Sequence, residues 1–493
     1  MQKTKKHILI LLLIMLMNSC AKNPVSGMPD FVTITETQEI EMGAAYHREI
    51  IKNAKILQNE EVNKYLSDLG IMIAKTSHRP NLNWKFTIID DPTFNAFATP
   101  GGYVYMYRGM LVHFNSEAEL AGVLSHEIAH ITARHAVRGM SAAQITNLLI
   151  GLAQSQVPGA GGITNSGFSL LNQLSNRAYS RKYEAEADDI AKEYLGRNSY
   201  NQDAMSDFLK TMRNADELEK EIAKKEGRPA RTGYHNIFST HPTTESRIDA
   251  MNETESRKGI DKREEFLKMI DGLPYGTSAE EGYVRNNIFY HPFFAIKFEF
   301  PENWRLDNFS EKLVISKNNI EITMISKNLL RDDIDNGLSP KRYLDLNIDE
   351  TSFLSKNTLI SEKVFEDNLL GHTYLYQNES INENEYIRYT VFFDTDDKKK
   401  KPKAWIFISK FKDMGNDKES DIIFNSFKKM NEQEIANSQG LKIKVIRFKD
   451  GMTYKSLADN SPLGRHAEGK LKLLNGHYPN DEPLVGSLIK IVE

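Results

Sequence analysis

The chain has 493 residues, of which 40% are hydrophobic and 26% are charged, and its 63 Lys and Arg against 67 Asp and Glu give a net charge of −4. This composition is ordinary for a globular protein of about three domains and excludes a disordered chain or a fibrous repeat. The near balance of charge provides no basic field for polyanions, so we expect no nucleic-acid partner. The single cysteine excludes an internal disulfide.

Residues 1–20 have the order of basic residues, apolar core and short polar end that is typical of a secretory signal peptide. The apolar run over residues 8–17 makes about 15 Å of helix, half the hydrocarbon thickness of a bilayer, so we expect no permanent spanning helix. The end of this segment, MLMNSC, resembles a bacterial lipobox, which implies a lipid on Cys20. A plain signal peptide with an incidental cysteine is the alternative. Ala21 does not resemble an inner-membrane retention signal, so we expect an outer-membrane anchor that faces the periplasm.

The hydrophobic periodicity divides the rest of the chain into three parts, which together predict a multidomain α+β protein. Residues 21–270 are expected to be mainly helical, with one small sheet over residues 84–107. After a linker at residues 273–277, the spacing of the apolar residues changes from helical to strand-like. Residues 283–430 therefore predict a separate α+β domain of unknown role. Its expected strands cover residues 295–300, 320–325, 386–393 and 404–410. Residues 438–493 predict a small unit of a strand, two short helices and a closing strand.

A predicted helix with two histidines one turn apart is the first indication of a metal site. Ser116 and Glu119 form a capping-box pattern that predicts the start of this helix. His126 and His130 are four residues apart and project from one face, the span needed to chelate one metal ion. Glu127 is then placed beside the water that such a metal would activate, which makes it the expected general base. So short a motif also arises by chance, so a further ligand is needed to support it.

A catalytic zinc site needs three protein ligands and one open position. In one class the third ligand is a histidine in the pattern H-E-x-x-H-x-x-G-x-x-H, which would place glycine at 133 and histidine at 136. Both positions are alanine, so this class is excluded. His135 follows His130 by five residues, about 140° around a helix, so we expect it to point away from the metal. It would then support the ligands from behind or pack in the core.

A second predicted helix, residues 177–195, is the better source of the third ligand. Glu184 and Asp188 lie one turn apart on one face of this helix. Glu184 could ligate the zinc, while Asp188 accepts a hydrogen bond from a ligating imidazole and fixes its tautomer. Taken alone, these residues would be read as an acidic surface helix. The pairing with the first motif favours the metal site.

The sequence HEIAHITARH at residues 126–135, followed by SRKYEAEAD at residues 180–188, resembles the zinc metallopeptidases related to HtpX and the CAAX prenyl protease. The similarity is greatest to their soluble bacterial lipoprotein branch of the BepA type, and it covers about residues 23–255. Further matching segments are residues 23–27, 95–105 and 239–248. The resemblance implies a zincin-type fold of mainly helices with a small sheet, metalloendopeptidase activity of the gluzincin type, and Zn²⁺ as the cofactor. It also implies His126, His130 and Glu184 as zinc ligands and Glu127 as the catalytic base.

Two residues further along the chain are also candidates for the catalytic centre. In BepA-like members, the histidine that matches His241 can approach the open position of zinc and restrain activity, so His241 is expected to be a regulatory fourth ligand at the catalytic centre. From its position before Pro242, at a predicted helix start, a capping histidine is the alternative. Arg247 is expected either to stabilise the oxyanion of the reaction or to pair with the acidic helix.

Residues 95–105 predict two short strands joined at Pro100 and the two glycines that follow. An exposed edge near the metal would hold an extended substrate peptide by main-chain hydrogen bonds. The residues expected to do so are Asn95, Ala96, Phe97 and Ala98. A hairpin that only stabilises the helices is the alternative.

The last part of the chain, residues 438–493, resembles a LysM-like βααβ module, which implies binding to glycans such as peptidoglycan. A purely structural module is the alternative. The combined expectation is a zinc-dependent endopeptidase in the bacterial envelope that hydrolyses peptide bonds of unfolded or assembling periplasmic and outer-membrane proteins, tethered to the membrane through a lipid on Cys20. The competing hypothesis is an envelope scaffold or peptidoglycan-binding protein with a latched or inactive metal site.

Overall fold

A computed structural model describes most of the chain. The described residues are 20–143, 179–226, 230, 245–253, 258–277, 281–309, 312–317, 320–348, 357–366, 369–378, 385–395, 401–438 and 440–493. The predicted signal peptide before Cys20 and the predicted regulatory residue His241 lie outside these ranges. Among the helices of the described ranges, none combines the length and the apolar character that crossing a membrane requires.

The first part of the chain is built around helix α5 (Glu117–Thr132), every residue of which is buried. A helix that is apolar on most of its surface belongs in the centre of a domain. The surrounding helices are α2 (Glu36–Asn53), α3 (Glu60–Lys75), α4 (Arg108–Leu111), α8 (Arg181–Arg197), α9 (Ala204–Lys225), α11 (Glu245–Glu253) and α12 (Arg263–Ile270). Among them, α3, α8, α9 and α12 contact α5 directly. A short hairpin of β1 (Cys20–Lys22) and β2 (Pro29–Phe31) precedes α2.

A three-stranded sheet lies beside α5. Its strands are β3 (Lys85–Ile89), β4 (Ala96–Thr99) and β5 (Tyr103–Tyr107), in the order β3-β5-β4. β3 runs parallel to β5, and β4 is antiparallel to β5 through a tight turn. Gly101 and Gly102 in this turn have φ angles of +83° and +104°, which glycine adopts without the strain that a Cβ would cause. The predicted pair of short strands is confirmed, and β4 forms one edge of this sheet.

The middle part of the chain contains two antiparallel sheets. The larger has seven strands in the order β10-β11-β12-β16-β15-β14-β13, and the smaller has four in the order β17-β9-β8-β7. The strands are β7 (Tyr283–Arg285), β8 (Ile288–His291), β9 (Ile296–Glu299), β10 (Arg305–Asn308), β11 (Leu313–Lys317), β12 (Ile320–Asn328), β13 (Asn357–Phe365), β14 (Gly371–Asn378), β15 (Glu385–Asp394), β16 (Lys403–Phe411) and β17 (Lys428–Lys429). The helices are α13 (Arg331–Asp335), α14 (Pro340–Asn347), α15 (Met414–Ser426) and α16 (Glu432–Ala436).

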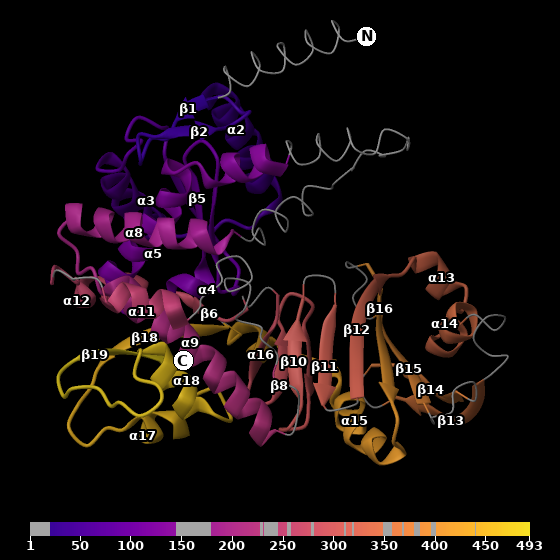
Figure 1. Cartoon of the computed structure of the whole chain (residues 1–493). Coiled ribbons are helices and arrows are strands. Elements are labelled where there is room, and N and C mark those ends of the chain that lie inside the picture. The colour runs from indigo at the N-terminus through magenta and orange to yellow at the C-terminus, as the bar shows by residue number, and fades with distance from the viewer. Residues whose placement is uncertain are drawn as a thin grey trace, which may run out of the picture.

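Helices cover both faces of the seven-stranded sheet. Phe424 of α15 packs edge-on against Phe407 on one face, while Tyr343 of α14 packs edge-on against Phe393 on the other. These contacts bury apolar side chains from both sides of the strands. The predicted mixture of helices and sheet in this part of the chain is confirmed, and Figure 1 shows it in orange beside the first part.

The C-terminal part has the predicted order of strand, two helices and strand. Its elements are β18 (Leu441–Arg447), α17 (Tyr454–Asp459), α18 (Ala467–Leu474) and β19 (Leu488–Val492). β18 lies between β19 and the short strand β6 (Pro274–Tyr275), so the predicted linker at residues 273–277 contains a strand of this sheet. Ile443, Leu474 and Val492 belong to the same apolar core as the side chains of α5. The C-terminal unit, yellow in Figure 1, is therefore continuous with the first part of the chain rather than appended to it.

A buried lysine ties β19 to the start of α5. The Lys490 side chain has no exposed surface, and its Nζ donates hydrogen bonds to the carbonyl oxygens of Val112 (3.0 Å) and Phe114 (2.7 Å). Burial lowers the pKa of Lys490 and raises that of Glu119, in the first turn of α5, to about 7, while the attraction between the two groups opposes both shifts. The loop that leads into α5 is thus held by the last strand of the chain.

We predict that Lys490→Met lowers the free energy of unfolding, because the carbonyl oxygens of Val112 and Phe114 lose their buried donor. The expected loss is about 1–3 kcal/mol in urea denaturation. The matched control is Lys444→Met on β18, whose side chain is 44% exposed, and it should change the same quantity by less than about 0.5 kcal/mol. Equal effects of the two substitutions would contradict a specific role for the buried amine.

Candidate metal centre

Helix α5 presents the two histidines of the first motif. The Ser116 hydroxyl accepts a hydrogen bond from the Glu119 backbone N–H (3.2 Å), as a helix cap requires. The Glu119 carboxylate accepts from the backbone N–H of Asn115 (2.8 Å) instead of that of Ser116, so the predicted capping box is displaced by one residue at its second bond. From this start, His126 and His130 lie one turn apart on the side of α5 that faces α8.

Helix α8 presents the acidic residues of the second motif. It begins at Arg181 after the cap residue Ser180, whose hydroxyl accepts a hydrogen bond from the Tyr183 N–H (3.3 Å). It ends at Arg197, two residues beyond the predicted end, and it begins later than predicted, because Tyr179 and Ser180 are not helical. Glu184 and Asp188 are both buried and both face α5.

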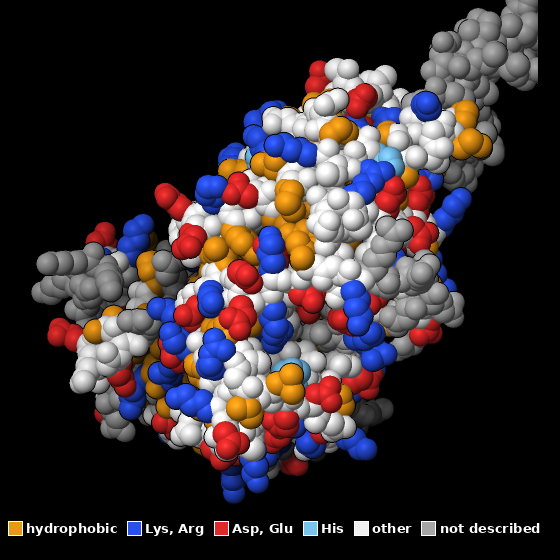
Figure 2. Space-filling view, turned by 90° about the vertical axis from the view of Figure 1, so that its left-hand side faces the viewer, with side chains coloured by type: hydrophobic (Ala, Val, Ile, Leu, Met, Phe, Trp, Pro, Cys, Tyr) orange, Lys and Arg blue, Asp and Glu red, His pale blue; other side chains and the backbone are white. Residues whose placement is uncertain are grey.

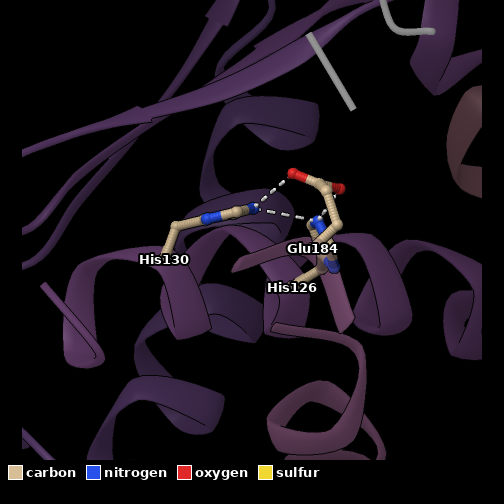
Figure 3. Close-up of side chains that lie close together, drawn as sticks. All are labelled: His126, His130 and Glu184. Carbon is tan, nitrogen blue, oxygen red and sulfur yellow. Dashed lines mark hydrogen bonds and ion pairs between the residues drawn. The ribbon is translucent and has the colours of Figure 1, made fainter. Parts of the chain in front are cut away.

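The side chains of His126, His130 and Glu184 converge on one point (Figure 3). The two Nε2 atoms lie 3.0 Å apart, and the Glu184 oxygens lie 3.4 Å from His126 Nε2 and 3.5 Å from His130 Nε2. Zinc bonds of about 2.0–2.2 Å at tetrahedral angles would separate the donor atoms by about 3.3–3.6 Å. Two imidazoles and a carboxylate are also donors that zinc prefers, so these residues fit a zinc ion with a fourth position left open.

Asp188 and Arg247 stand behind the first ligand. His126 Nδ1 lies 3.0 Å from Asp188 Oδ1, which directs the other ring nitrogen toward the metal position. Arg247 donates from Nε and Nη2 to the two Asp188 oxygens, each over 2.7 Å, and its Nη1 lies 3.0 Å from Glu184 Oε2. Of the two predicted roles of Arg247, the geometry therefore shows the pairing with the acidic helix.

The protonation of His126 reflects these surroundings in the metal-free protein. Burial disfavours the imidazolium, but hydrogen bonds and attraction to Asp188 and Glu184 outweigh it and raise the pKa of His126 to about 10. The same cluster holds the pKa of Asp188 below its usual value: burial opposes this shift, and His126 and Arg247 outweigh it. The site thus favours a positive charge at the position between Glu184 and the histidines.

His135 lies directly behind the second ligand, because the helix does not continue to it. α5 ends at Thr132, and Arg134 has a left-handed φ of +55°, which separates α5 from the helical residues 135–143 that follow. His135 Nδ1 consequently lies 2.8 Å from His130 Nδ1. The direction predicted from an unbroken helix was wrong, while a position behind the ligands is what the structure shows.

Glu127 is buried in the same site, with 2% of its surface exposed, and it follows the first ligand on α5. The negative charge of Glu127 is one of the charges that raise the pKa of Arg247: burial opposes this shift, and Asp188, Glu184 and Glu127 outweigh it. The carboxylate and the guanidinium therefore belong to one electrostatic cluster. The role of Glu127 as the general base stays a prediction.

The predicted substrate-binding residues lie on and beside the edge strand β4. Asn95, Ala96 and Phe97 are buried, and Ala98 is half-buried. Ala98 lines a small hollow with His130 and Tyr179, so the end of β4 lies close to the metal position. Because most of these side chains are buried, only the main chain of β4 could serve many substrate sequences, and the binding role stays a prediction.

Sequence reasoning missed Glu186 and Arg138. His135 Nε2 lies 3.3 Å from Glu186 Oε2, and Arg138 Nη1 lies 3.0 Å from the same oxygen. Glu186 is the middle acid of the run Glu184, Glu186, Asp188, and this alternation was the available signal. Hydrogen bonding from His135, and the bond and charge of Arg138, lower the pKa of Glu186 to about 2 against the effect of burial.

A buried H-E-x-x-H helix joined to a glutamate from a second helix defines the site of a metallopeptidase. Comparison with known families agrees with this class, since residues 59–255 match the model of peptidase family M48. The similarity to peptidase family M48 thus covers residues 59–255, and the site described above lies within these matched residues.

Individual relatives cover the same part of the chain. A Vibrio cholerae protein of the beta-barrel assembly-enhancing protease type is 30% identical over 270 residues, 52% of this chain and 51% of its own length. The beta-barrel assembly-enhancing protease of Escherichia coli is 28% identical over 240 residues, 46% of each chain. Mitochondrial metalloendopeptidase OMA1 of Schizosaccharomyces pombe is 27% identical over 234 residues, 47% of this chain and 65% of its own length. The chain thus spans about half the length of the bacterial relatives it matches.

We predict that Asp188→Asn weakens zinc binding by about 10–100-fold, because His126 loses the carboxylate that orients its ring. Competition with a chromophoric chelator measures the dissociation constant. The matched control is Asp189→Asn, since Asp189 is the exposed neighbour on the same helix, and its affinity should equal that of the unsubstituted protein. Equal affinities of all three proteins would show that Asp188 does not support the ligand.

Proposed function

We propose that this protein is a zinc-dependent endopeptidase of the bacterial envelope. The observation that carries the proposal is the convergence of three buried side chains, His126 and His130 from α5 and Glu184 from α8, beside Glu127 on α5. A metal site that only stabilises the fold needs the three ligands but does not need a carboxylate such as Glu127 beside them. Hydrolysis of a peptide bond does need one.

The residues of the site divide the work of the reaction. A zinc ion, when bound, supplies a Lewis acid that polarises the scissile carbonyl and lowers the pKa of a water molecule to about 7. The Glu127 carboxylate accepts the proton of the attacking water and then delivers it to the leaving amine. Arg247 holds Glu184 and Asp188 in place, and Asp188 holds the ring of His126. The edge of β4 would align an extended substrate beside the metal.

Envelope polypeptides that are unfolded or being assembled are the proposed substrates. Two of the relatives are described as beta-barrel assembly-enhancing proteases, which supports a place in quality control or assembly of periplasmic and outer-membrane proteins. The lipobox-like sequence that ends at Cys20 supports a lipid anchor in the outer membrane, with the peptidase facing the periplasm. Figure 2 shows acidic and basic side chains intermixed on the face in view, without a single-sign field.

The C-terminal unit supports a second, subordinate proposal. Its order of strand, two helices and strand is that of a LysM-like module, so we propose contact with peptidoglycan through residues 438–493. A scaffold protein with an inactive metal site remains the competing function. Because the unit shares its core with α5, deleting it would disturb the peptidase as well, and single substitutions are the better way to separate the two functions.

We predict that Glu127→Gln lowers the cleavage rate of an unfolded polypeptide such as casein by at least about 100-fold, because the amide cannot accept the proton of water. Zinc content should stay near that of the unsubstituted protein, since Glu127 is not a ligand. Cleavage products resolved by gel electrophoresis and elemental analysis measure the two quantities. Glu193→Gln is the control, because Glu193 is 46% exposed on α8. Full metal-dependent cleavage by Glu127→Gln would contradict the mechanism.

A further inference from the structure

The two histidine ligands are supported in different ways. Behind His126 stands Asp188, which belongs to the zinc-binding helix pair itself. Behind His130 stands another imidazole, that of His135, with the two Nδ1 atoms 2.8 Å apart. If His130 Nε2 is to bind zinc, its Nδ1 must carry the proton and donate it to His135 Nδ1, which leaves the proton of His135 on Nε2. A group that accepts from His135 Nε2 therefore fixes the tautomers of both rings.

Glu186 is in position to be that acceptor. Its Oε2 lies 3.3 Å from His135 Nε2, and Arg138 Nη1 donates to its two oxygens over 3.0 and 3.1 Å. The His135 ring has no exposed surface and stacks on Tyr183, with centroids 4.5 Å apart and planes 9° apart. Arg138 lies over the same tyrosine at 4.6 Å. This packing leaves the side chains little freedom to rearrange. They form a series of contacts that runs from His130 through His135 and Glu186 to Arg138.

This series of side-chain contacts extends from Arg138 to the N-terminal hairpin. Arg138 Nε lies 3.7 Å from Asp30 Oδ2, and the same Asp30 oxygen accepts a hydrogen bond of 2.7 Å from Asn23 Nδ2. The Asn23 side chain is buried, and its oxygen accepts from the backbone N–H groups of Val25 (2.8 Å) and Ser26 (3.1 Å). The turn at Asn23–Gly27, one of the segments that resemble the M48 relatives, thereby holds Asp30 toward Arg138.

Two more contacts attach the same part of the chain to residues on either side of His135. The Thr33 backbone N–H donates to Ser141 Oγ (3.0 Å), and Arg134 Nη2 donates to the Ile34 carbonyl (3.0 Å). Arg134 is the left-handed residue that brings His135 behind His130. Residues 30–34 therefore contact the 134–141 segment on both sides of His135.

From these contacts we propose that the N-terminal segment, residues 20–34, is a working part of the metal centre. Through Asp30, Arg138, Glu186 and His135 it holds His130 in the orientation that binds zinc, and these four side chains are positioning residues for that ligand. The inference rests on the proposed function, since it assumes that His130 binds zinc. It also means that the segment directly after the predicted lipid-bearing Cys20 is coupled to the metal site, so that displacing the hairpin from the domain weakens zinc binding.

The test is a double-mutant cycle on zinc affinity, with Asp30→Asn and His135→Phe made singly and together in the full chain without its signal peptide. Phenylalanine keeps the ring stacked on Tyr183 but removes both nitrogens. We expect His135→Phe to weaken zinc binding about 10-fold or more. Asp30→Asn should weaken it about 3-fold alone and have almost no further effect beside His135→Phe, because its influence passes through His135. Chelator competition with zinc alone as the probe gives the four dissociation constants.

The control is Asp68→Asn, since Asp68 is 63% exposed and pairs only with Lys64 among the described contacts; it should leave zinc affinity unchanged. Thermal melting of the four metal-free proteins shows whether each variant folds. Equal effects of Asp30→Asn in both backgrounds, or an effect on melting without one on affinity, would overturn the proposal. Absence of zinc binding by the unsubstituted protein would instead overturn the proposed function.

Discussion

The structure depends on the burial of acidic side chains between α5 and α8. Glu127, Glu184 and Asp188 are all at least nine-tenths buried, and an ionised carboxylate without a partner costs several kcal/mol in such a place. The positively charged partner from another helix is Arg247, which reaches Glu184 and Asp188. In the metal-free protein the Asp188 and Glu184 carboxylates raise the pKa of His126, against the effect of burial, which favours a proton on its ring. A divalent cation between Glu184 and the two histidines would replace that proton, so the charge of the site and its geometry favour the same occupant.

Side chains from distant parts of the sequence hold both ends of the helix that carries this site. At the start of α5, Lys490 from the last strand binds the carbonyl oxygens of Val112 and Phe114. At its end, Arg79 donates to the Ile131 carbonyl (3.1 Å) and to Glu39 of α2 (2.6 Å). A helix fixed at both ends keeps its histidines in register with α8, as a pre-organised metal site requires. The C-terminal unit, Arg79 and α2 thus help to position the helix that carries the metal site.

Local patterns in the sequence predicted most of the site, and tertiary contacts account for the rest. The spacing of His126, His130 and Glu184 is a property of two helices, and the helical period was enough to place them on facing sides. His135 was misplaced because its position depends on the left-handed Arg134, which Glu39 holds from a distant helix (2.8 Å). The predicted α+β character of residues 283–430 is confirmed, but strands such as β11 and β14 are short or carry several polar residues, so their periodicity gave no signal. The burial of Lys490 has no local signature at all.

X-ray diffraction at the zinc absorption edge, on crystals of the protein grown with zinc, would test the central claim most directly. The anomalous difference map should show one strong peak within about 2.0–2.2 Å of His126 Nε2, His130 Nε2 and a Glu184 oxygen, with Glu127 beside but not bound to it. A map without a peak at these three side chains, from crystals of protein reloaded with zinc, would contradict the account. A peak held by other residues would do so as well.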